Sequence, residues 1–529
     1  MIRWIVRSVL MLLVLATLGA TACSPAKLDV VLYYPSGDDG SEIYQKIAKF
    51  EVRFAGQALD DPSGAKTEIS ADTNGLALND IACKKEESNL PFDLRVVGFD
   101  ENDNIVGSGR QVIYQLCGKP RNIYLFFSPL EQFSTLSRFR PESNVTEPGR
   151  MERIRAGHRI TYLPDGRLLI TGGAIIDGPG NFSETTNHTE IFDPETGLFE
   201  DGPKMKNARA FHTATLVGSR IFIAGGLDVQ DGNVVSVGSV EVFEVNEKNE
   251  LVASEKTATL SEPRAFHTAI VTPNQGYVFL YGGVNWDAGK PTINTQWELF
   301  EADGTDIGKG QIKEADRRAW HGAVRLVDGK ILVAGGATLE SDKWKALNST
   351  LFLEFSDDDS TIKVSSGDAM KVARVAPAMI RLNDDAGARV LISGGMETKE
   401  TSIFEPSKVH NTMEVRAATG KFEETLTMKS ARVFHSINQL EDGRVMLFGG
   451  FDGTTMASGA EVFLVGSSSE GLKKDSVSIA QRRDRFYHSA MVLNNGSLLV
   501  LGGVAVDEKG KYITLYRGEI FNPRPPPTE

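Results

Sequence analysis

Seven arginines recur along the C-terminal three quarters of the chain and could bring a strong positive charge to one place. Guanidinium groups bind carboxylates bidentately, so a ring of them would suit an anion or an acidic sugar. The alternative is that each arginine forms an ion pair between neighbouring repeats, with a glutamate of a later strand. Seven cations in one ring would repel one another unless neutralised, which favours the ion pairs. The arginines are Arg155, Arg209, Arg264, Arg318, Arg374, Arg432 and Arg485, and the candidate glutamates are Glu190, Glu241, Glu298, Glu461 and Glu519.

Six histidines each stand three residues after one of these arginines. They are His158, His212, His267, His321, His435 and His488. One interpretation is a metal-binding ring, but a tetrahedral metal needs three or four ligands at about 2 Å, and one histidine per repeat is spread too widely for that. We therefore expect each histidine to hydrogen-bond the backbone at the start of an inner strand. The sequence predicts no metal and no cofactor.

A pair of glycines marks the repeat that must position these residues. The pairs begin at Gly172, Gly225, Gly282, Gly335, Gly394, Gly449 and Gly502, which are 53 to 59 residues apart. Each repeat contains an alternating strand, a hydrophobic strand ending in the two glycines, a polar loop and two further strands. A four-stranded sheet of this kind cannot bury both faces alone, so neighbouring sheets must stack, and a closed ring completes the stack.

This pattern of hydrophobics, double glycine and separated aromatics resembles the kelch repeat. The resemblance implies an all-β fold with a seven-bladed kelch-type β-propeller over residues 144–529. The tryptophan usual in the outer strand is Phe199 or Phe422 here, and repeat five departs furthest, with proline at the histidine position and a third strand expected at Ser402. The last repeat lacks a fourth strand, and we predict that residues 144–150 supply it and close the ring.

The loops that follow the double glycines vary in length and are polar. Loops on a repeated scaffold commonly carry recognition, so this face is the predicted binding surface, with Trp286 as a candidate ligand-binding residue. The alternative is that these loops are solvated connectors without a specific ligand.

No catalytic motif stands out in the repeats. Some kelch proteins resemble galactose oxidase, whose chemistry needs a copper and a Tyr–Cys crosslink, but the repeats contain no cysteine. Phosphate-loop, zincin and nucleophile-elbow motifs are absent as well. We therefore expect a non-enzymatic binding or scaffold protein with a protein or glycan partner. The alternative is a carbohydrate-active enzyme, epimerase-like or hydrolase-like, with acidic residues on the loop face.

The N-terminus has the features of a bacterial lipoprotein signal. Residues 1–22 contain two arginines, a short apolar run and then small residues before Cys23. The letters "ATAC" resemble a lipobox, with Ala20 in place of the preferred leucine. The resemblance implies lipidation at Cys23, and Ser24 favours the outer membrane. The net charge of −13 argues against a nucleic-acid partner.

A smaller domain is expected between the signal and the repeats. Strand alternation over residues 27–128 resembles an immunoglobulin-like β-sandwich, and residues 129–143 form a linker. Cys83 and Cys117 are predicted to form a disulfide in an oxidising compartment, with a catalytic or metal-binding thiol as the alternative.

Overall fold

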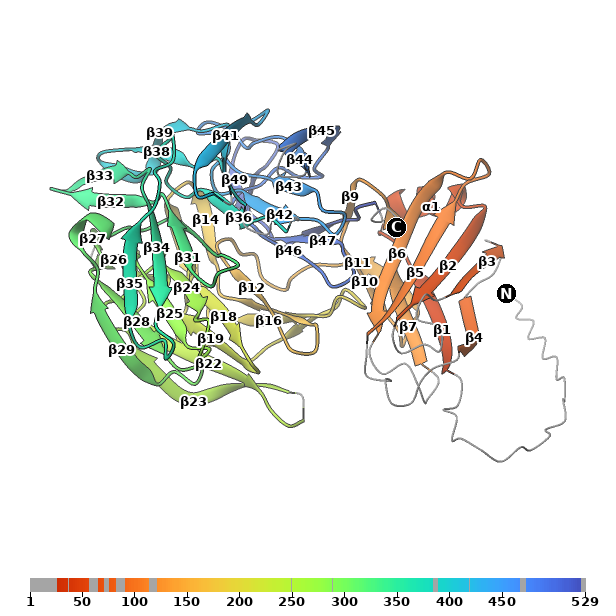
Figure 1. The fold of residues 1–529 in the computed structure, drawn as a ribbon. Helices are drawn as coiled ribbons and strands as arrows, with labels where there is room; N and C mark the ends of the chain where they lie inside the picture. Colours follow the sequence, from red (N-terminus) through yellow and green to blue (C-terminus); the bar gives the residue numbers. More distant parts are fainter. Residues whose placement is uncertain are drawn as a thin grey trace.

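The computed structural model describes residues 26–36, 38–56, 65–70, 76–81, 91–113, 121–248, 250–287, 289–383, 389–417, 419–466 and 472–524. Strands dominate this part of the chain, which contains the helix α1 (Asp38–Lys46) and the short 3-10 helix η2 (Glu314–Asp316). In these ranges no helix has both the length and the hydrophobicity that a bilayer span requires. Figure 1 shows a small N-terminal domain beside a much larger ring of sheets.

Two sheets with one shared core make up the N-terminal domain. One sheet has the order β4 (Leu76–Ile81), β1 (Ala26–Tyr33), β7 (Arg121–Phe126). The other has the order β3 (Ala65–Ser70), β2 (Lys49–Ala55), β5 (Phe92–Phe99), β6 (Ile105–Ile113), β8 (Ser128–Pro129). Val30 and Leu125 of the first sheet pack with Val52 and Leu94 of the second. β1 and β7 run parallel, and the immunoglobulin-like assignment of this domain stays a prediction.

Seven four-stranded antiparallel sheets follow, which agrees with the predicted all-β propeller. The innermost strands are β12 (Arg159–Tyr162), β18 (Thr213–Val217), β24 (Thr268–Val271), β30 (Gly322–Arg325), β36 (Ala378–Arg381), β42 (Ser436–Gln439) and β46 (Ser489–Val492). The second strands are β13 (Leu168–Thr171), β19 (Arg220–Ala224), β25 (Val278–Tyr281), β31 (Ile331–Ala334), β37 (Val390–Ser393), β43 (Val445–Phe448) and β47 (Leu498–Leu501). Nearly all residues of these second strands are buried.

The third and fourth strands complete each sheet. The third strands are β16 (Thr189–Phe192), β22 (Ser239–Val245), β28 (Gln296–Phe300), β34 (Thr350–Phe355), β40 (Thr412–Arg416), β44 (Ala460–Val465) and β50 (Gly518–Phe521). The fourth strands are β17 (Phe199–Asp201), β23 (Leu251–Thr259), β29 (Asp306–Gln311), β35 (Ile362–Ser366), β41 (Phe422–Thr427), β45 (Leu472–Ile479) and, for the last sheet, β9 (Phe133–Thr135).

Neighbouring sheets bury each other's faces. Phe222 and Val242 of the second sheet, for example, share one hydrophobic cluster with Leu280 and Phe300 of the third. Contact between β46 and β12 brings the last sheet against the first. No sheet therefore leaves a large apolar face in water, which is the physical reason for the ring.

The closing strand is not the segment that the sequence suggested. β9 pairs with β50 as the outer strand of the last sheet, whereas β11 (Val145–Pro148), within the predicted segment, pairs with β10 (Ser137–Arg140). Phe133 of β9 is 4% exposed and packs on Phe448 and Phe521, while Val145 is 42% exposed. The last sheet thus takes the more apolar strand, and the predicted linker contains it.

Repeat five also differs from its prediction. Ser402 opens β39 (Ser402–Val409), which pairs with β38 (Met396–Lys399) outside the four-stranded sheet. The third strand is β40, ten residues further along the chain, because the loop after this double glycine carries a longer hairpin.

Most of the loops after the double glycines form two-stranded hairpins. Besides β38–β39, they are β14 (Ala174–Gly178) with β15 (Asn181–Thr185), β20 (Leu227–Gln230) with β21 (Asn233–Ser236), β26 (Val284–Asp287) with β27 (Lys290–Ile293), β32 (Ala337–Glu340) with β33 (Lys343–Ala346), and β48 (Val504–Val506) with β49 (Tyr512–Thr514). Adjacent hairpins contact one another, as β21 does β26 and β49 does β14. They form a second tier, which we call the hairpin tier.

Candidate functional site

A ring of residues with positive φ surrounds the axis of the propeller. Each stands two residues after a repeat arginine. We call them the axial ring: Gly157, Phe211, Phe266, Trp320, Ala376, Phe434 and Tyr487, with φ between 50° and 64°. Their backbones are linked around the axis: the Phe211 amide donates to the Gly157 carbonyl at 2.8 Å, and the Gly157 amide donates to the Tyr487 carbonyl at 2.9 Å. The second of these bonds joins the first repeat to the last.

The repeat arginines lie inside the sheets and face buried partners. All seven are at most 1% exposed. Arg209 is typical, because its Nη1 donates to the Gly225 carbonyl at 2.9 Å and its Nη2 donates to Glu241 Oε1 at 2.5 Å. Burial lowers the pKa of Arg209, and the charge of Glu241 opposes that shift. The guanidinium remains a cation, and the carboxylate of Glu241 neutralises its charge.

The same type of ion pair occurs in six repeats, within a repeat rather than between repeats as predicted. The pairs are Arg155–Glu190, Arg209–Glu241, Arg264–Glu298, Arg374–Glu414, Arg432–Glu461 and Arg485–Glu519. The sequence analysis did not identify Glu414, because it expected the third strand of repeat five at Ser402 and not at β40. These contacts support ion pairing over a site for an external anion at the repeat arginines.

Arg318 is the exception among the seven. Leu351 occupies the position on β34 that glutamate holds in the other repeats, opposite Val333 of β31. Arg318 instead donates from Nε to the Asp316 carbonyl at 3.1 Å and from Nη2 to Ser349 Oγ at 3.1 Å. Burial lowers its pKa, while Tyr281 and Asp316 oppose that shift. This guanidinium is therefore held by neutral oxygens.

All the repeat histidines except His158 connect neighbouring sheets through hydroxyl groups, not through backbone groups as predicted. His267 Nε2 lies 2.9 Å from Thr213 Oγ1, and His321 Nε2 lies 2.8 Å from Thr268 Oγ1. His435 and His488 make the same type of contact with Ser393 and Ser436. Burial lowers the pKa of His321 and of His435 to about 3, so both rings are neutral at pH 7.

The first glycine of each pair is required by this packing. At Gly225, φ is 61° and an added Cβ would lie 2.2 Å from the Arg264 carbonyl oxygen and 2.8 Å from His267 Cε1. A side chain at this position would displace the arginine and histidine segment of the next repeat. The double glycine is thus the place where one sheet touches the next.

A cavity of about 260 Å³ lies on the axis of the propeller. We call it the axial cavity. Its lining consists of the axial ring together with His158, Arg159, His267, His321, Pro377, His435 and His488. The described lining contains no Asp or Glu, so the carboxylate pair that the enzyme alternative requires is not found there.

Aromatic side chains from the hairpin tier pack on the axial ring. Trp286 of β26 is 8% exposed and meets Trp320 edge to face at 5.5 Å between ring centroids, and it stacks on Phe404 of β39 at 5.9 Å. Trp344 of β33 and Phe182 of β15 belong to the same buried cluster. Trp286, the candidate ligand-binding aromatic, is therefore part of a hydrophobic core.

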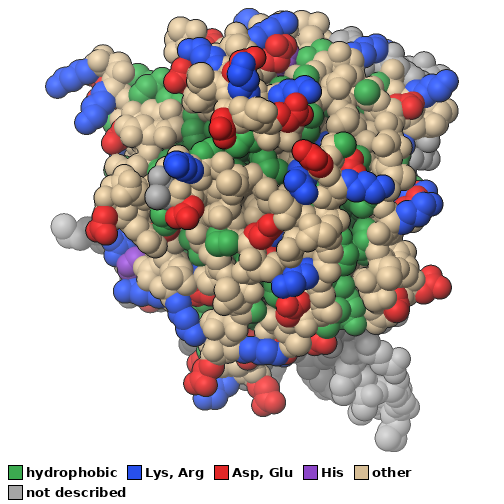
Figure 2. Space-filling model, turned by 90° about the vertical axis from the view of Figure 1, so that its left-hand side faces the viewer, with side chains coloured by type: hydrophobic (Ala, Val, Ile, Leu, Met, Phe, Trp, Pro, Cys, Tyr) green, Lys and Arg blue, Asp and Glu red, His purple; other side chains and the backbone are tan. Residues whose placement is uncertain are grey.

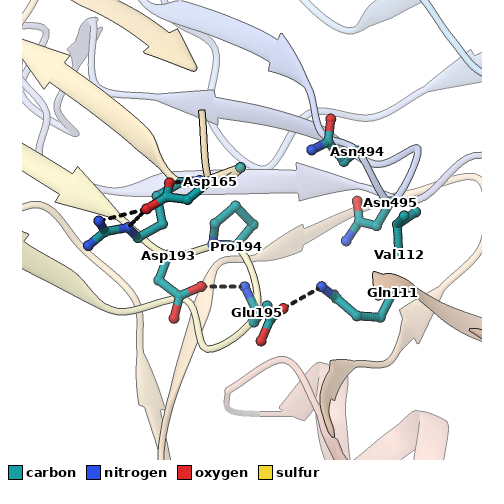
Figure 3. A pocket seen from close by; sticks show the side chains of 10 residues that line it. Gln111, Val112, Asp165, Asp193, Pro194, Glu195, Asn494 and Asn495 are labelled. Atoms are coloured by element: carbon teal, nitrogen blue, oxygen red, sulfur yellow. Dashed lines mark hydrogen bonds and ion pairs between the residues drawn. The ribbon is translucent and has the colours of Figure 1, made fainter. Parts of the chain in front are cut away.

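A second pocket, of about 250 Å³, lies between the N-terminal domain and the propeller. We call it the interdomain pocket. Figure 3 shows its polar lining, with Asp165 and Asp193 on one side and Gln111 and Asn495 on the other. Gln111 Nε2 donates to Glu195 Oε1 at 3.0 Å. Asp165 accepts hydrogen bonds from Arg167, and Asp193 accepts from the Glu195 amide at 2.8 Å. These carboxylates are engaged in local turns and in the domain contact.

Two of the predicted sites cannot be located. Cys23, Cys83 and Cys117 lie outside the described residues, as do the signal residues 1–22. Lipidation and the disulfide therefore stay predictions. Within the described ranges, no three His, Cys, Asp or Glu side chains are grouped as the ligands of a metal would be.

Comparison with known proteins gives limited matches. No family model matches the chain. Beta-scruin of Limulus polyphemus is 31% identical over 124 residues, which are 23% of this chain and 13% of that relative's length. A solved structure titled "Structure of YjhT" aligns with 62% of this chain and 99% of its own, at 11% sequence identity and a TM-score of 0.45.

Proposed function

We propose that this protein is a non-enzymatic interaction scaffold of the bacterial cell envelope, whose propeller presents the hairpin tier to a protein or glycan partner. One observation carries the proposal. The repeat arginines and histidines, which could do chemistry, are almost all engaged in contacts that hold the ring together, whereas the hairpins differ from repeat to repeat. Variable loops on a repeated scaffold are suited to recognition.

The exposed surface of the hairpin tier suits polar recognition. Lys343 pairs with Glu400 at 2.8 Å, and Lys399 pairs with Glu405 at 2.7 Å, all on neighbouring hairpins. Figure 2 shows Lys and Arg side chains interspersed with Asp and Glu on the side away from the N-terminal domain. Such a face favours a partner with complementary mixed charge over a purely apolar one.

The experiment compares the two ends of one repeat. A photoreactive amino acid replaces Asp342, in the exposed turn of the β32–β33 hairpin, or Asp328, in the exposed turn between β30 and β31 at the opposite end of the sheet. After irradiation of producing cells, we expect a discrete crosslinked species from position 342 and none from position 328. Crosslinks from 328 alone, or from neither position, would contradict the proposed binding face.

We further propose that the scaffold is held at the membrane by lipid on Cys23. The export signal and the lipobox-like residues before this cysteine support the proposal, and more than one acyl chain makes such an anchor stable. Cys23→Ser is expected to move the protein from the membrane fraction to the soluble fraction. An unchanged distribution would contradict the anchor without bearing on the hairpin face.

A further inference from the structure

Arg159 breaks the pattern at the first position of the inner strands. The residue after the repeat histidine is small in every other repeat, and only the first repeat has a long cationic side chain there. The six equivalents are Thr213, Thr268, Gly322, Ala378, Ser436 and Ser489. Six small residues at this position are compatible with the fold, so packing of the ring does not require an arginine here.

The Arg159 side chain lines the axial cavity and has no acidic partner among the described residues. Its Nε donates to the His212 carbonyl at 2.7 Å, and this is the hydrogen bond that orients the guanidinium. Arg159 is exposed, so its guanidinium meets water in the cavity, while the protein around it desolvates the cation in part and lowers the pKa of Arg159. An exposed cation in a cavity without acidic side chains attracts anions from solution.

Further polar atoms of the residues that line this cavity have no hydrogen-bond partner within the described ranges; besides those of Tyr487 and His158, they are Nδ1 of His267, His321, His435 and His488. Tyr487 is 7% exposed, and its hydroxyl has no hydrogen-bond partner in the described structure. His158 is 1% exposed, and neither of its ring nitrogens has one. Buried polar groups are nearly always satisfied, so such orphans mark a place for water or a ligand. A phenol hydroxyl and a neutral imidazole can each donate to an oxygen atom.

We propose that the axial cavity is a binding site for a small oxyanion, a carboxylate or a phosphate. The Arg159 guanidinium supplies the charge and two or more N–H donors in a fork that matches either group. Tyr487 of the last repeat lines the same cavity, and a small turn of its ring would let the buried hydroxyl donate to the ligand. At about 260 Å³ the cavity has room for a small molecule that carries such a group, and the aromatic side chains of Phe266 and Trp320 suit an apolar body.

This site is separate from the proposed partner-binding face and does not depend on it. The hairpin tier offers its outer surface, whereas the oxyanion would lie on the axis, against the inner side of the axial ring. The protein could hold such a ligand whether or not a partner binds the hairpin tier. A negative result for one proposal therefore leaves the other unaffected.

The experiment measures binding of defined anions to the purified full chain by calorimetric titration. The probes are inorganic phosphate, acetate and benzoate, and sodium chloride at equal ionic strength corrects for general salt effects. We expect saturable binding at one site per chain for at least one probe, together with a rise in Tm. Phosphate binding alone would assign a phosphate ligand, and acetate or benzoate binding alone would assign a carboxylate.

Arg159→Thr is the decisive variant because Thr213 and Thr268 show that threonine fits this position. We expect it to fold and to bind the probe roughly tenfold to a hundredfold more weakly. Tyr487→Phe should weaken binding by a smaller factor. The matched control is Arg220→Thr, on β19, where Arg220 is exposed and paired with Glu244. Equal affinity in Arg159→Thr and wild type, or no saturable binding of any probe below roughly 10 mM, would overturn the proposal.

Discussion

The buried Arg–Glu pairs use nearly every polar atom of both side chains. Glu241 accepts from the Lys206 and Asn207 amides as well as from Arg209, so it also fastens the segment that precedes the arginine. Removing such a carboxylate leaves a buried cation without a counter-charge and two amides without their acceptor. These pairs therefore matter for stability mainly because the loss of one partner is costly.

Glu241→Ala is expected to lower the free energy of unfolding by about 3–5 kcal/mol, because an unpaired guanidinium stays buried. The control is Glu244→Ala on the same strand, whose partner Arg220 is 44% exposed and whose loss should change stability by about 0.5 kcal/mol or less. Urea unfolding curves followed by circular dichroism compare the two variants. Similar losses in both would refute the distinction between buried and exposed pairs.

The neutral repeat histidines make the protein sensitive to acid. Burial lowers the pKa of His321 to about 3 in the folded state, against about 6.5 in an unfolded chain. Between these values the unfolded chain binds a proton that the folded chain does not, so stability is full above pH 6.5 and falls as the pH falls toward 3. Each such histidine contributes a slope of about 1.4 kcal/mol per pH unit within this window.

His321→Gln is expected to remove one such slope while keeping a side-chain donor for Thr268. Denaturant titrations at pH 7, 5.5 and 4.5 measure the free energy of unfolding of the variant and of wild type. The difference between the two proteins should shrink as the pH falls. A difference that is constant across these pH values would show that His321 is not kept neutral by the fold.

At the scale of elements, the double glycine decides how closely one sheet approaches the next. Gly225 and Gly218 both have φ near 60°, but only Gly225 has neighbours within reach of an added Cβ. Gly218→Ala should therefore cost about 1–2 kcal/mol from backbone strain alone. Gly225→Ala should cost about 1–3 kcal/mol more, because the Arg264 carbonyl must move. Thermal melting of both variants tests this, and equal losses would contradict a packing role for the glycine.

The closing strand β9 gives a second test at this scale. Phe133→Ala is expected to lower stability by about 3–5 kcal/mol, because Phe133 packs on Phe448 and Phe521 between the last sheets. Val145→Ala on β11, which is exposed, should stay within about 0.5 kcal/mol of wild type. If Val145→Ala were the more harmful change, the closure assigned here would be wrong.

The number of sheets and the order of strands within them could be predicted because each repeat restates the same pattern. Where the pattern lapses, the prediction failed. The isolated apolar residue Phe133 carries no repeat signature, and the strand near Ser402 has the composition of a third strand but lies in an inserted hairpin. Ligand binding by Trp286 stays a prediction, and the structure adds that other aromatic side chains of the hairpin tier pack on this residue.

The candidate site was hidden for a different reason. The repeat arginines and histidines attracted attention because they recur, yet recurrence here means a structural role. Arg159 stands out only when the seven inner strands are aligned on the axis and their first residues are compared. Whether a cation has a partner is decided by neighbours from distant repeats, which the sequence does not display.

At the scale of the whole molecule, the two domains share polar contacts, of which those of Asn522 are buried. Asn522 Nδ2, just beyond β50, donates to the Ser108 carbonyl at 2.8 Å and to the Ser128 carbonyl at 3.1 Å. Arg110 of β6 pairs with Glu441, in the turn between β42 and β43. These contacts connect the N-terminal domain to the last two repeats of the ring, which lie beside it in Figure 1.

The double variant Asn522→Ala, Glu441→Gln is expected to weaken this connection, since it removes the hydrogen bonds of Asn522 to two carbonyls and the interdomain carboxylate partner of Arg110, which keeps only Asp93 of its own domain. Differential scanning calorimetry should show one transition for wild type and two separated transitions for the variant. Arg140→Ala, an exposed change on β10, serves as the control and should leave a single transition. One unchanged transition in the double variant would show that the domains are coupled by other contacts.

β9 and β50 pair in the last sheet, although the strands of all the other sheets lie between them in the chain. β9 is synthesised before all the other strands of the ring, and its partner β50 after them. The last sheet can be completed only once β50 has been made. Until then, the hydrophobic strand β9 has no partner in the ring.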